Sequence, residues 1–314
     1  MKSAVITGAT GVLGTALVKK LASENIETFV ICHPNSRRND TILKSPYVHK
    51  IFCDLSEIKT IPSKIQLSID AFFHFAWLGT QNNANRMNMY LQNENVKYTL
   101  DAVYVAKALN CQVFIGAGSQ AEYGRVEGII SPDHIEKPIS GYGMAKLCAG
   151  QMTQALCKSF GIRHIWPRVV SVYGENDAPK TLISMIIRKL LLKETPSLTA
   201  GEQLWDYLYS EDAADAFYAM ACNGRDGAKY VLGSGKTKPL REFMIETRDA
   251  IDPNLPLGIG EIPYYPDQAM HLEADISSLT KDTGWKPKVT FEKGICHVIE
   301  KMKESILGGG QTSL

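Results

Sequence analysis

The chain has 314 residues, of which 45% are hydrophobic, and its 34 Lys and Arg against 33 Asp and Glu give a formal net charge of +1. This balance excludes bulk attraction to nucleic acid or to anionic lipid, so we expect neither partner. No apolar stretch is long enough for a membrane span or a signal sequence, which predicts a cytoplasmic protein with a large buried core. The cysteines are scattered singly and no His, Cys and carboxylate cluster has metal-site spacing, so we predict no metal site.

A glycine-rich turn follows the first predicted strand, residues 3–7, and leads into a predicted helix. Gly8, Gly11 and Gly14 let the backbone reverse tightly and approach a diphosphate closely, and the helix N-terminus then faces that anion. The turn therefore predicts a dinucleotide site, although a plain tight strand-to-helix connection would have the same pattern. The residues assigned to the cofactor from this segment are Gly8, Thr10, Gly11, Val12, Leu13 and Gly14.

The second predicted strand, residues 27–32, ends without the acidic residue that would accept hydrogen bonds from the ribose hydroxyls of NAD. Arg37 and Arg38 follow it and could pair with the 2′-phosphate of NADP. We therefore favour NADP as the cofactor and keep NAD as possible. A solvated basic loop is the alternative interpretation of this segment.

Two more strands are predicted over residues 49–53 and 71–76. Asp54 follows the first and could cap a short helical turn, and His74 in the second is typical of a packed strand residue. The next predicted strand, residues 112–117, is followed by Ser119. Ligands of open α/β sheets lie beyond the carboxyl ends of strands, so the Ser119 hydroxyl could donate to a substrate oxygen, or it could cap a turn.

A predicted helix begins near Tyr142 and carries Lys146 one turn later, on the same face. A tyrosine pKa of about 10 must fall to about 7 for acid or base work near neutral pH, and one ammonium about 4 Å away supplies that at an effective dielectric near 20. The pair suits hydride chemistry in which an alcohol loses its proton to Tyr142. A surface Tyr/Lys pair has the same spacing, and the N-terminal turn is what favours the catalytic interpretation.

Strand-like and helix-like runs alternate through residues 163–170, which predicts a doubly wound parallel α/β sheet of the Rossmann type. Beyond residue 174 we predict a helix over 179–193, a strand over 206–209, a helix over 211–222 and a strand over 229–232 that returns to the first sheet. The predicted domains are a nucleotide-binding domain over 1–173 and about 206–235, a smaller α/β substrate domain over about 174–205 and 236–307, and a flexible tail over 308–314.

Together these motifs resemble the extended short-chain dehydrogenase/reductase superfamily, which includes nucleotide-sugar epimerases, dehydratases and ketoreductases. The matching segments are the turn from Gly8 to Gly14, Asp54-Leu55, His74-Phe75-Ala76, Asn95, Ser119, the Tyr142/Lys146 pair, residues 168–174 and residues 284–287. The resemblance implies that Asp54 and Leu55 contact the adenine and that Ala76 and Trp77 line the cofactor path. It also implies that Lys146 holds the nicotinamide ribose. It adds Asn95 and Val170 to the cofactor site.

The smaller domain is expected to select the substrate. Family members that bind nucleoside-diphosphate sugars usually carry Asn where this chain has Ser171, and Arg where it has Trp205 and His271. Losing two arginines removes the strongest bidentate phosphate contacts, and Lys180, Arg188 or backbone amides could take their place. Trp205 could stack on a base or sugar, or pack between the domains. The residues assigned to the substrate are Ser119, Gln120, Ser171 and Trp205.

The residues after Ser119 narrow the expected reaction. By resemblance, dehydratases place acidic residues directly after this position, whereas this chain has Gln120 and Ala121, with Glu122 displaced by one position and turned to the opposite face of an extended segment. Elimination is thus disfavoured. We predict a keto-sugar reductase that transfers hydride at C4 of a nucleotide-linked sugar, with Tyr142 exchanging the proton and Ser119 orienting the oxygen. The alternatives are a 4-epimerase that retains NAD and a non-catalytic dinucleotide sensor.

The segment over residues 86–110 carries apolar residues on more than one face, which are Leu91, Val96, Leu100, Val103 and Tyr104. One face could meet another subunit, or a neighbouring helix of the same chain could cover it. By resemblance, we expect a homodimer formed by paired helices.

Overall fold

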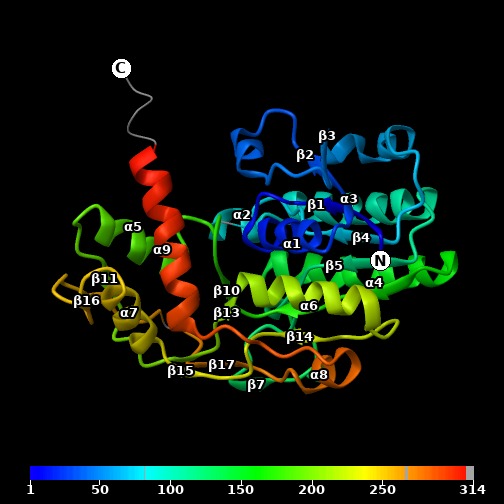
Figure 1. The fold of residues 1–314 in the computed structure, drawn as a ribbon. Helices are drawn as coiled ribbons and strands as arrows, with labels where there is room; N and C mark the ends of the chain where they lie inside the picture. The colour runs from blue at the N-terminus through cyan, green and yellow to red at the C-terminus, as the bar shows by residue number, and fades with distance from the viewer. Residues whose placement is uncertain (81, 266–267, 309–314) are drawn as a thin grey trace.

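A parallel sheet of six strands forms the centre of the computed structural model, which describes residues 1–80, 82–265 and 268–308. Its strand order is β3-β2-β1-β4-β5-β8, and Figure 1 labels β1 to β5. The strands are β1 (Ser3–Thr7), β2 (Glu27–Cys32), β3 (Val48–Phe52), β4 (Ala71–His74), β5 (Val113–Gly116) and β8 (Arg163–Ile165). This arrangement confirms the predicted doubly wound α/β fold, and β1 and β2 begin and end at the predicted residues.

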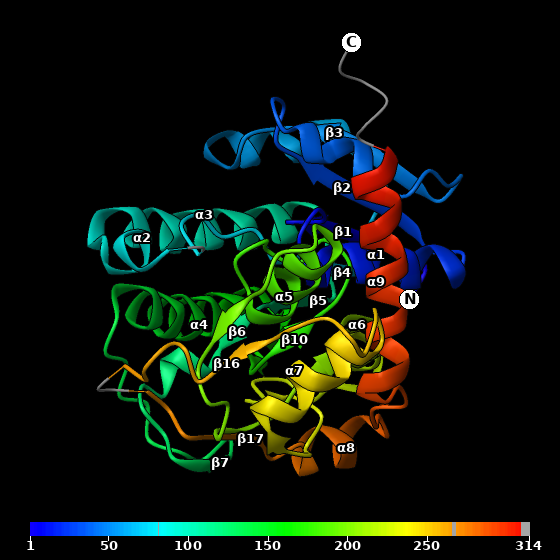
Figure 2. The same cartoon turned by 90° about the vertical axis from the view of Figure 1, so that its left-hand side faces the viewer.

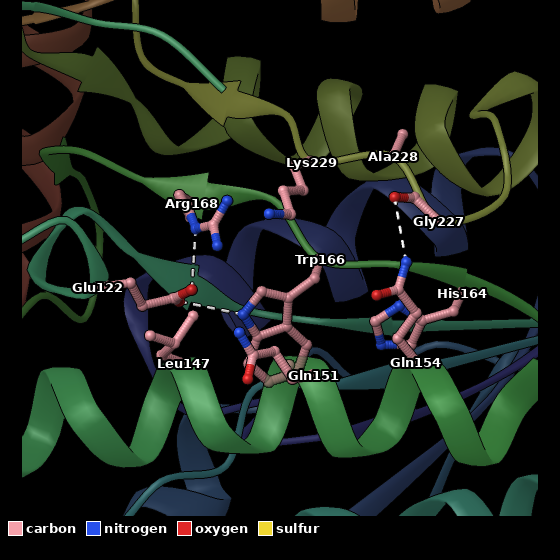
Figure 3. A pocket seen from close by; sticks show the side chains of 11 residues that line it. Glu122, Leu147, Gln151, Gln154, His164, Trp166, Arg168, Gly227, Ala228 and Lys229 are labelled. Carbon is pink, nitrogen blue, oxygen red and sulfur yellow. Dashed lines mark hydrogen bonds and ion pairs between the residues drawn. The ribbon is translucent and has the colours of Figure 1, made fainter. Parts of the chain in front are cut away.

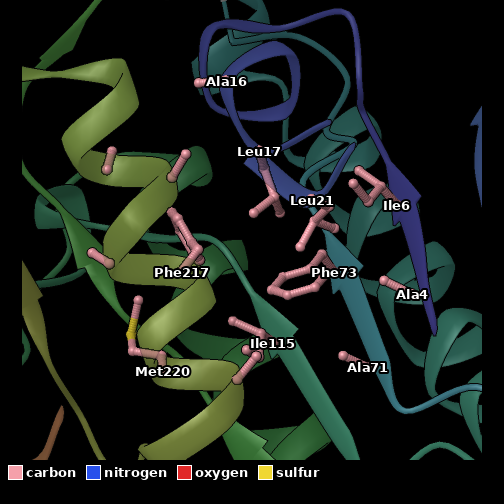
Figure 4. Close-up of a cluster of buried hydrophobic side chains, with 14 of the residues drawn as sticks. Ala4, Ile6, Ala16, Leu17, Leu21, Ala71, Phe73, Ile115, Phe217 and Met220 are labelled. Atoms are coloured by element: carbon pink, nitrogen blue, oxygen red, sulfur yellow. The ribbon is translucent and has the colours of Figure 1, made fainter. Parts of the chain in front are cut away.

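Helices cover both faces of the sheet (Figures 1 and 2). The covering helices are α1 (Val12–Ser23), α6 (Ser210–Asn223), α3 (Met89–Ala108) and α4 (Gly141–Phe160). Because side chains alternate between faces along a strand, Ile6 of β1 packs with α1 and α6, whereas Val5 packs with α3. Figure 4 shows the first of these clusters, in which Leu17, Phe73 and Phe217 belong to three different elements.

Two expected strands differ from the prediction. The strand expected over residues 163–170 is divided into β8 and β9 (Arg168–Val169), because Pro167 has no N–H to donate to a ladder. The strand expected over residues 229–232, β14 (Val231–Leu232), pairs with β9 and not with the six-stranded sheet, which corrects the prediction. On its other side β9 pairs with β6 (Gly118–Ser119), so the residues that follow β6 and β9 lie beside each other.

The strand expected over residues 206–209 is shorter than predicted, as β13 (Leu208–Tyr209). The Asp206 carboxylate is buried and accepts the backbone N–H groups of Ser234, Gly235 and Ala274. These bonds hold Asp206 out of the ladder. The carboxylate thereby joins the end of β14 to β17 (His271–Ala274).

A separate hydrophobic cluster lies among α5 (Leu182–Leu191), α7 (Leu240–Asp249) and α9 (Phe291–Gly308). Figure 1 shows these helices to one side of the sheet and its covering helices. The cluster falls largely within the predicted smaller domain, whose limits remain a prediction. Gly308 is the last residue of α9, and residues 309–314 of the predicted tail lie outside the described residues. None of the described helices combines the length and apolar character that a membrane crossing requires.

The remaining elements are short. The helical ones are α2 (Asn83–Met87), α8 (Ser277–Thr283) and the 3₁₀ turns η1 (Arg37–Thr41), η2 (Leu55–Lys64) and η3 (Gln120–Glu122). The strands are β7 (Gly128–Ile130), β10 (Val172–Tyr173), β11 (Ser197–Leu198), β12 (Leu204–Trp205), β15 (Lys238–Pro239) and β16 (Gly258–Ile259).

Candidate functional site

The strand order reverses direction between β1 and β4, and the loops at their carboxyl ends form a crevice there. Gly8 follows β1 with a φ of +74°, and a Cβ at this position would lie 2.6 Å from the backbone nitrogen of Ala76. Only glycine fits this conformation and this close approach. His74 is packed in β4, where its Nδ1 lies 2.9 Å from the hydroxyl of Thr7, as the alternative interpretation expects.

A cavity of about 450 Å³ opens at this crevice. Eight of the residues assigned to the cofactor line it, namely Gly8, Thr10, Gly11, Arg38, Asp54, Leu55, Ala76 and Trp77. In the part of the chain that the structure describes, no side chain caps the start of α1, so its first N–H groups are available to an anion. The open cavity, the glycine turn and the uncapped helix together fit a dinucleotide.

Other residues assigned to the cofactor do not line this cavity. They are Val12, Leu13 and Gly14 on α1, the exposed Arg37, the buried Asn95 and Val170, and Tyr142 and Lys146, which were assigned to the cofactor as well as to catalysis. Asn95 instead fixes the loop after β4, because its side chain accepts the N–H of Leu78 at 2.7 Å and donates to the Leu78 carbonyl at 2.9 Å. Gly14 is required by packing, since a Cβ there would lie 2.3 Å from the carbonyl oxygen of Gly8.

Basic and acidic side chains meet at the edge of the cavity near the end of β2. The guanidinium of Arg38 donates to the carbonyls of Thr10 and Asn176, so it bridges the glycine turn and a loop that follows β10. Asp54 lies 3.2 Å from the imidazole of His33 and also caps η2 by accepting the N–H of Ser56 at 2.9 Å. Hydrogen bonds from Ser56 lower the pKa of Asp54.

Ser119 stands at the junction of β6 and η3. Its hydroxyl donates to Gln120 Oε1 at 2.8 Å and accepts the N–H of Ala121 at 3.2 Å. The Glu122 carboxylate accepts the N–H of Ser119 at 2.8 Å, which completes a capping box. The residues after Ser119 therefore form a helical turn and not the extended segment that we expected.

Glu122 is fully buried behind this turn. Its Oε2 accepts from Arg168 Nε at 2.9 Å, and its Oε1 accepts from Trp166 Nε1 at 3.0 Å. Figure 3 shows this network beside a cavity of about 20 Å³, which is room for about one water molecule. Arg168 also donates to Glu136 at 2.9 Å. Both oxygens of the Glu122 carboxylate thus accept hydrogen bonds from groups inside the protein.

Tyr142 and Lys146 lie on α4, in its first two turns. The ammonium of Lys146 is buried, donates to the Ala117 carbonyl at 2.6 Å and lies 3.7 Å from the centroid of the Trp77 ring. It lies 5.8 Å from the centroid of the Tyr142 ring. Trp77 meets Tyr142 edge to face, with ring centroids 6.1 Å apart. The two predicted catalytic side chains therefore both contact the indole of Trp77, which lines the cavity, while neither of them lines it.

The charges around the Tyr142 phenol differ from the expected arrangement, in which the Lys146 ammonium alone lowers the pKa of Tyr142. Burial lowers the pKa of Lys146 to about 7, against the opposing effect of Glu122. Burial also raises the pKa of Tyr142, while the Ser119 hydroxyl and the positive charge of Arg86 act to lower it. The ammonium of Lys146 is directed at Ala117 and Trp77, so it does not supply the dominant effect on the phenol.

The residues assigned to the substrate lie at the ends of neighbouring strands. Ser119 pairs with Val169 in the β6–β9 register, and Ser171 lies two residues beyond the end of β9. Ser171 Oγ accepts from the indole N–H of Trp205 at 3.0 Å. Trp205 also packs in two hydrophobic clusters, so the structure shows the packing role that we kept as its alternative.

Residues 4–233 match the family model described as the NAD dependent epimerase/dehydratase family. The chain belongs to this family. This chain is 25% identical to the "Putative UDP-glucose 4-epimerase" of Methanocaldococcus jannaschii, and the match covers 96% of this chain and 98% of the relative. It is also 25% identical to the dTDP-glucose 4,6-dehydratase of Salmonella typhimurium, over 94% of this chain and 91% of the relative.

A solved structure gives the same picture of the fold. The UDP-N-acetylglucosamine 4-epimerase of Methanobrevibacter ruminantium M1, in complex with UDP-N-acetylmuramic acid, superposes with a TM-score of 0.86 at 22% identity. The match covers 97% of this epimerase/dehydratase family member and 99% of that chain.

Sequence reasoning missed one residue at the site of this family member, Arg86, and the structural role of another, Glu122. Arg86 stacks on Tyr142 from the short helix α2, which no periodic pattern could reveal. Glu122 anchors Ser119 from a buried position. The S-x-x-E spacing of a capping box was present at residues 119–122 and is the signal that could have found it.

Proposed function

We propose that the protein is a nucleotide-sugar 4-epimerase that holds NAD through the reaction. The epimerase/dehydratase family and the matching length of the Methanocaldococcus relative support hydride chemistry on a nucleotide-linked sugar. The dehydratase relative is equally similar over most of its length. The choice between the two reactions therefore rests on the residues that follow Ser119.

The observation that carries the choice is the burial of Glu122. Elimination of water needs an acid and a base close to the sugar in addition to the proton-exchanging tyrosine. Here Gln120 and Ala121 follow Ser119, and neither can exchange a proton in that role. Glu122 is fully buried and bonded to Arg168, Trp166 and the Ser119 backbone. Epimerisation needs no further acid, so it matches the residues present.

In the proposed reaction, bound NAD supplies a hydride acceptor for the sugar carbon and a donor for its return. Tyr142 takes the hydroxyl proton from the substrate and gives it back after the ketone has turned its other face. Ser119 donates a hydrogen bond to the same oxygen once its hydroxyl leaves Gln120. Lys146 would hold the nicotinamide ribose from its place against Trp77, and Asn95 holds Leu78 in the cavity wall.

A keto-sugar reductase is the second candidate, because the ribose end of the cavity favours it. No carboxylate ends β2, and Arg38 lines the cavity at that end. An arginine there can pair with the 2′-phosphate of NADP, and a reductase needs a dinucleotide that dissociates after each turnover. Arg37 is exposed and does not line the cavity, so Arg38 is the residue on which this preference depends.

Mass spectrometry of dinucleotides extracted from the purified protein separates these candidates. Retained NAD, together with interconversion of the 4-epimers of a nucleotide-linked sugar without added cofactor, is the expected result. An empty protein that oxidises NADPH with a 4-keto-sugar would establish the reductase and reject the epimerase.

Replacement of Tyr142 by Phe tests the proposed proton exchange. We expect Tyr142→Phe to lower kcat by at least about 10²-fold, since general acid–base catalysis contributes that much. Retained dinucleotide should be unchanged, because the hydroxyl lies beyond the cavity that holds it. Exposed Tyr265 offers a matched control, since Tyr265→Phe removes a hydroxyl far along the chain. Equal activity of Tyr142→Phe and Tyr265→Phe would reject the role of Tyr142.

A further inference from the structure

Arg86 lies against the face of the proposed catalytic tyrosine. Its guanidinium carbon is 4.1 Å from the centroid of the Tyr142 ring, and the side chain is half-buried. Tyr142 is therefore in contact with a cation that comes from a different element, the last turn of α2. Among the residues that the structure describes, no carboxylate forms an ion pair with Arg86. Its charge is directed to the ring and not to a structural partner.

The helix that carries Arg86 is fixed in place by two sets of contacts. At the start of α4, a Cβ on Gly141 would lie 3.1 Å from the Arg86 carbonyl oxygen and 2.8 Å from the sulfur of Met89. On the other side, Gln92 donates to the carbonyl of Asn85 at 3.0 Å and accepts from the Trp77 indole at 2.8 Å. The position of Arg86 is thus tied to the Trp77 ring that covers Lys146.

Four groups lie around the phenol of Tyr142, and they come from β6, η3, α4 and α2. Ser119 on β6 is within hydrogen-bonding reach, and Glu122 on η3 carries the opposing negative charge. Lys146 shares α4 with Tyr142, but its ammonium bonds the Ala117 carbonyl and faces Trp77. Arg86 is the cation whose guanidinium lies directly over the ring.

We propose that Arg86 is a positioning residue that supplies the positive charge beside the Tyr142 phenol during proton exchange. The inference rests on the proposed function, because it assigns the proton exchange to Tyr142. The Tyr/Lys spacing assigned both the stabilisation of the phenol and the contact with the cofactor to Lys146, and the proposal divides these two roles between Arg86 and Lys146. Arg86 stabilises the ionised phenol, and Lys146 remains with the Ala117 carbonyl at the cofactor cavity.

The physical basis is the preference of a cation for an electron-rich ring. A guanidinium over a tyrosine face is attracted by the ring quadrupole, and the attraction increases when the phenol loses its proton and the ring gains negative charge. The charge of Arg86 accordingly lowers the pKa of Tyr142 against the larger, opposite effect of burial. Arginine keeps this charge at every working pH.

The pH dependence of kcat/KM tests the assignment. We expect Arg86→Gln to lower kcat/KM about tenfold near neutral pH, for a half-exposed charge a few ångströms from the phenol. The loss should shrink as the pH rises, because hydroxide then ionises the phenol without help. KM should stay nearly unchanged, and Arg86→Lys should restore part of the activity. Arg241→Gln, which removes an exposed arginine of α7, is the matched control and should leave the profile unchanged.

A second measurement needs no substrate. Ultraviolet difference titration of the whole protein against Tyr142→Phe reports the ionisation of Tyr142, and the same difference is taken in the Arg86→Gln background. We expect Tyr142 to ionise at higher pH without Arg86. If this shift is seen while no nucleotide-linked sugar is turned over, the proposed function fails and the role of Arg86 stands.

Three outcomes would overturn the inference. One is an unchanged ionisation of Tyr142 in Arg86→Gln. Another is a loss of kcat that is equal at every pH, as expected if Arg86 only holds α2 in place. The third is a rise in KM alone, which would make Arg86 a substrate contact.

Discussion

Lys146 is held as a cation almost without water. Its ammonium has one hydrogen bond, to the Ala117 carbonyl, and the rings of Trp77, Tyr142 and Trp166 lie around it. Removing an ammonium from water is costly unless a negative charge compensates it, and Glu122 is the carboxylate that acts on it here. The burial lowers the pKa of Lys146 to about 7. Keeping this charge beside the cavity therefore lowers the free energy of unfolding of the protein.

We predict that Lys146→Met stabilises the protein near neutral pH by about 2 kcal/mol, the typical gain when a buried charge becomes apolar. The ordinary pKa of 10.5 applies to the unfolded chain and about 7 to the folded chain. Below the lower value Lys146 is protonated in both the folded and the unfolded chain, and the folded state bears the full free-energy cost of burying the ammonium. Between the two values the unfolded chain binds more protons, so the stability of the wild type rises with pH.

The difference between the two proteins should therefore shrink as the pH rises toward the upper value. Chemical denaturation at several pH values measures it, with turnover recorded in parallel. Exposed Lys97 on α3 provides the control, since Lys97→Met should change stability little. A destabilised Lys146→Met protein at neutral pH would contradict the prediction.

The turn η3 is the element on which the geometry of the site depends. Its capping box joins Ser119 to Glu122, and the ion pair of Glu122 with Arg168 ties the turn to β9. A buried pair of this kind adds little net stability, but breaking one side of it leaves an uncompensated charge. Here that charge would be the guanidinium of Arg168, whose other acidic partner among the described residues is Glu136.

We expect Glu122→Gln to destabilise the protein by about 3 kcal/mol, because the amide keeps the shape but removes the charge that faces Arg168. Thermal unfolding measures the change, with Glu127→Gln as the control, since Glu127 is exposed in a surface ion pair. The double variant Glu122→Gln/Arg168→Met should recover part of the loss. Additive losses in the double variant would show that the pair is not coupled.

At the scale of the whole molecule, α3 and α4 both carry exposed apolar side chains. Four of the residues that suggested a second interface, Leu91, Val96, Leu100 and Val103, are buried or half-buried within the chain. Tyr104 stays half exposed. Other exposed apolar side chains nearby in the sequence are Met87, Met89 and Tyr90, and on α4 Met144 and Met152. We propose that these helices pair with those of a second copy to form the expected homodimer.

Charges introduced on this surface test the dimer. Tyr104→Glu and Met152→Glu should each shift the protein toward a monomer in sedimentation velocity, because a buried charge without a partner opposes association. Leu192→Glu changes a side chain of similar exposure at the end of α5 and should leave the mass unchanged. A wild-type protein that is monomeric at all concentrations would exclude the proposal.

The sequence alone determined the strand-turn-helix at residues 3–23, the alternation of strands and helices that gives a parallel sheet, and the shared helix face of Tyr142 and Lys146. These features depend on the spacing of residues that are close in sequence and on the backbone conformation that Gly8 permits. Both can be recognised in a short stretch of sequence. From Gln120 and Ala121 the sequence also disfavours a dehydratase, which stays a prediction. It could not reveal where the Lys146 ammonium points, because that depends on Trp77, a residue distant in sequence.

Only the tertiary structure decided the charges around the phenol. Arg86 reaches Tyr142 from a five-residue helix, and Gly118 and Gly150 leave room for the Trp166 indole that bonds Glu122. These contacts join segments that are distant along the chain and carry no local pattern. The buried carboxylate, the turned ammonium and the stacked guanidinium arise because packing, and not spacing, sets which charges lie within a few ångströms of one another.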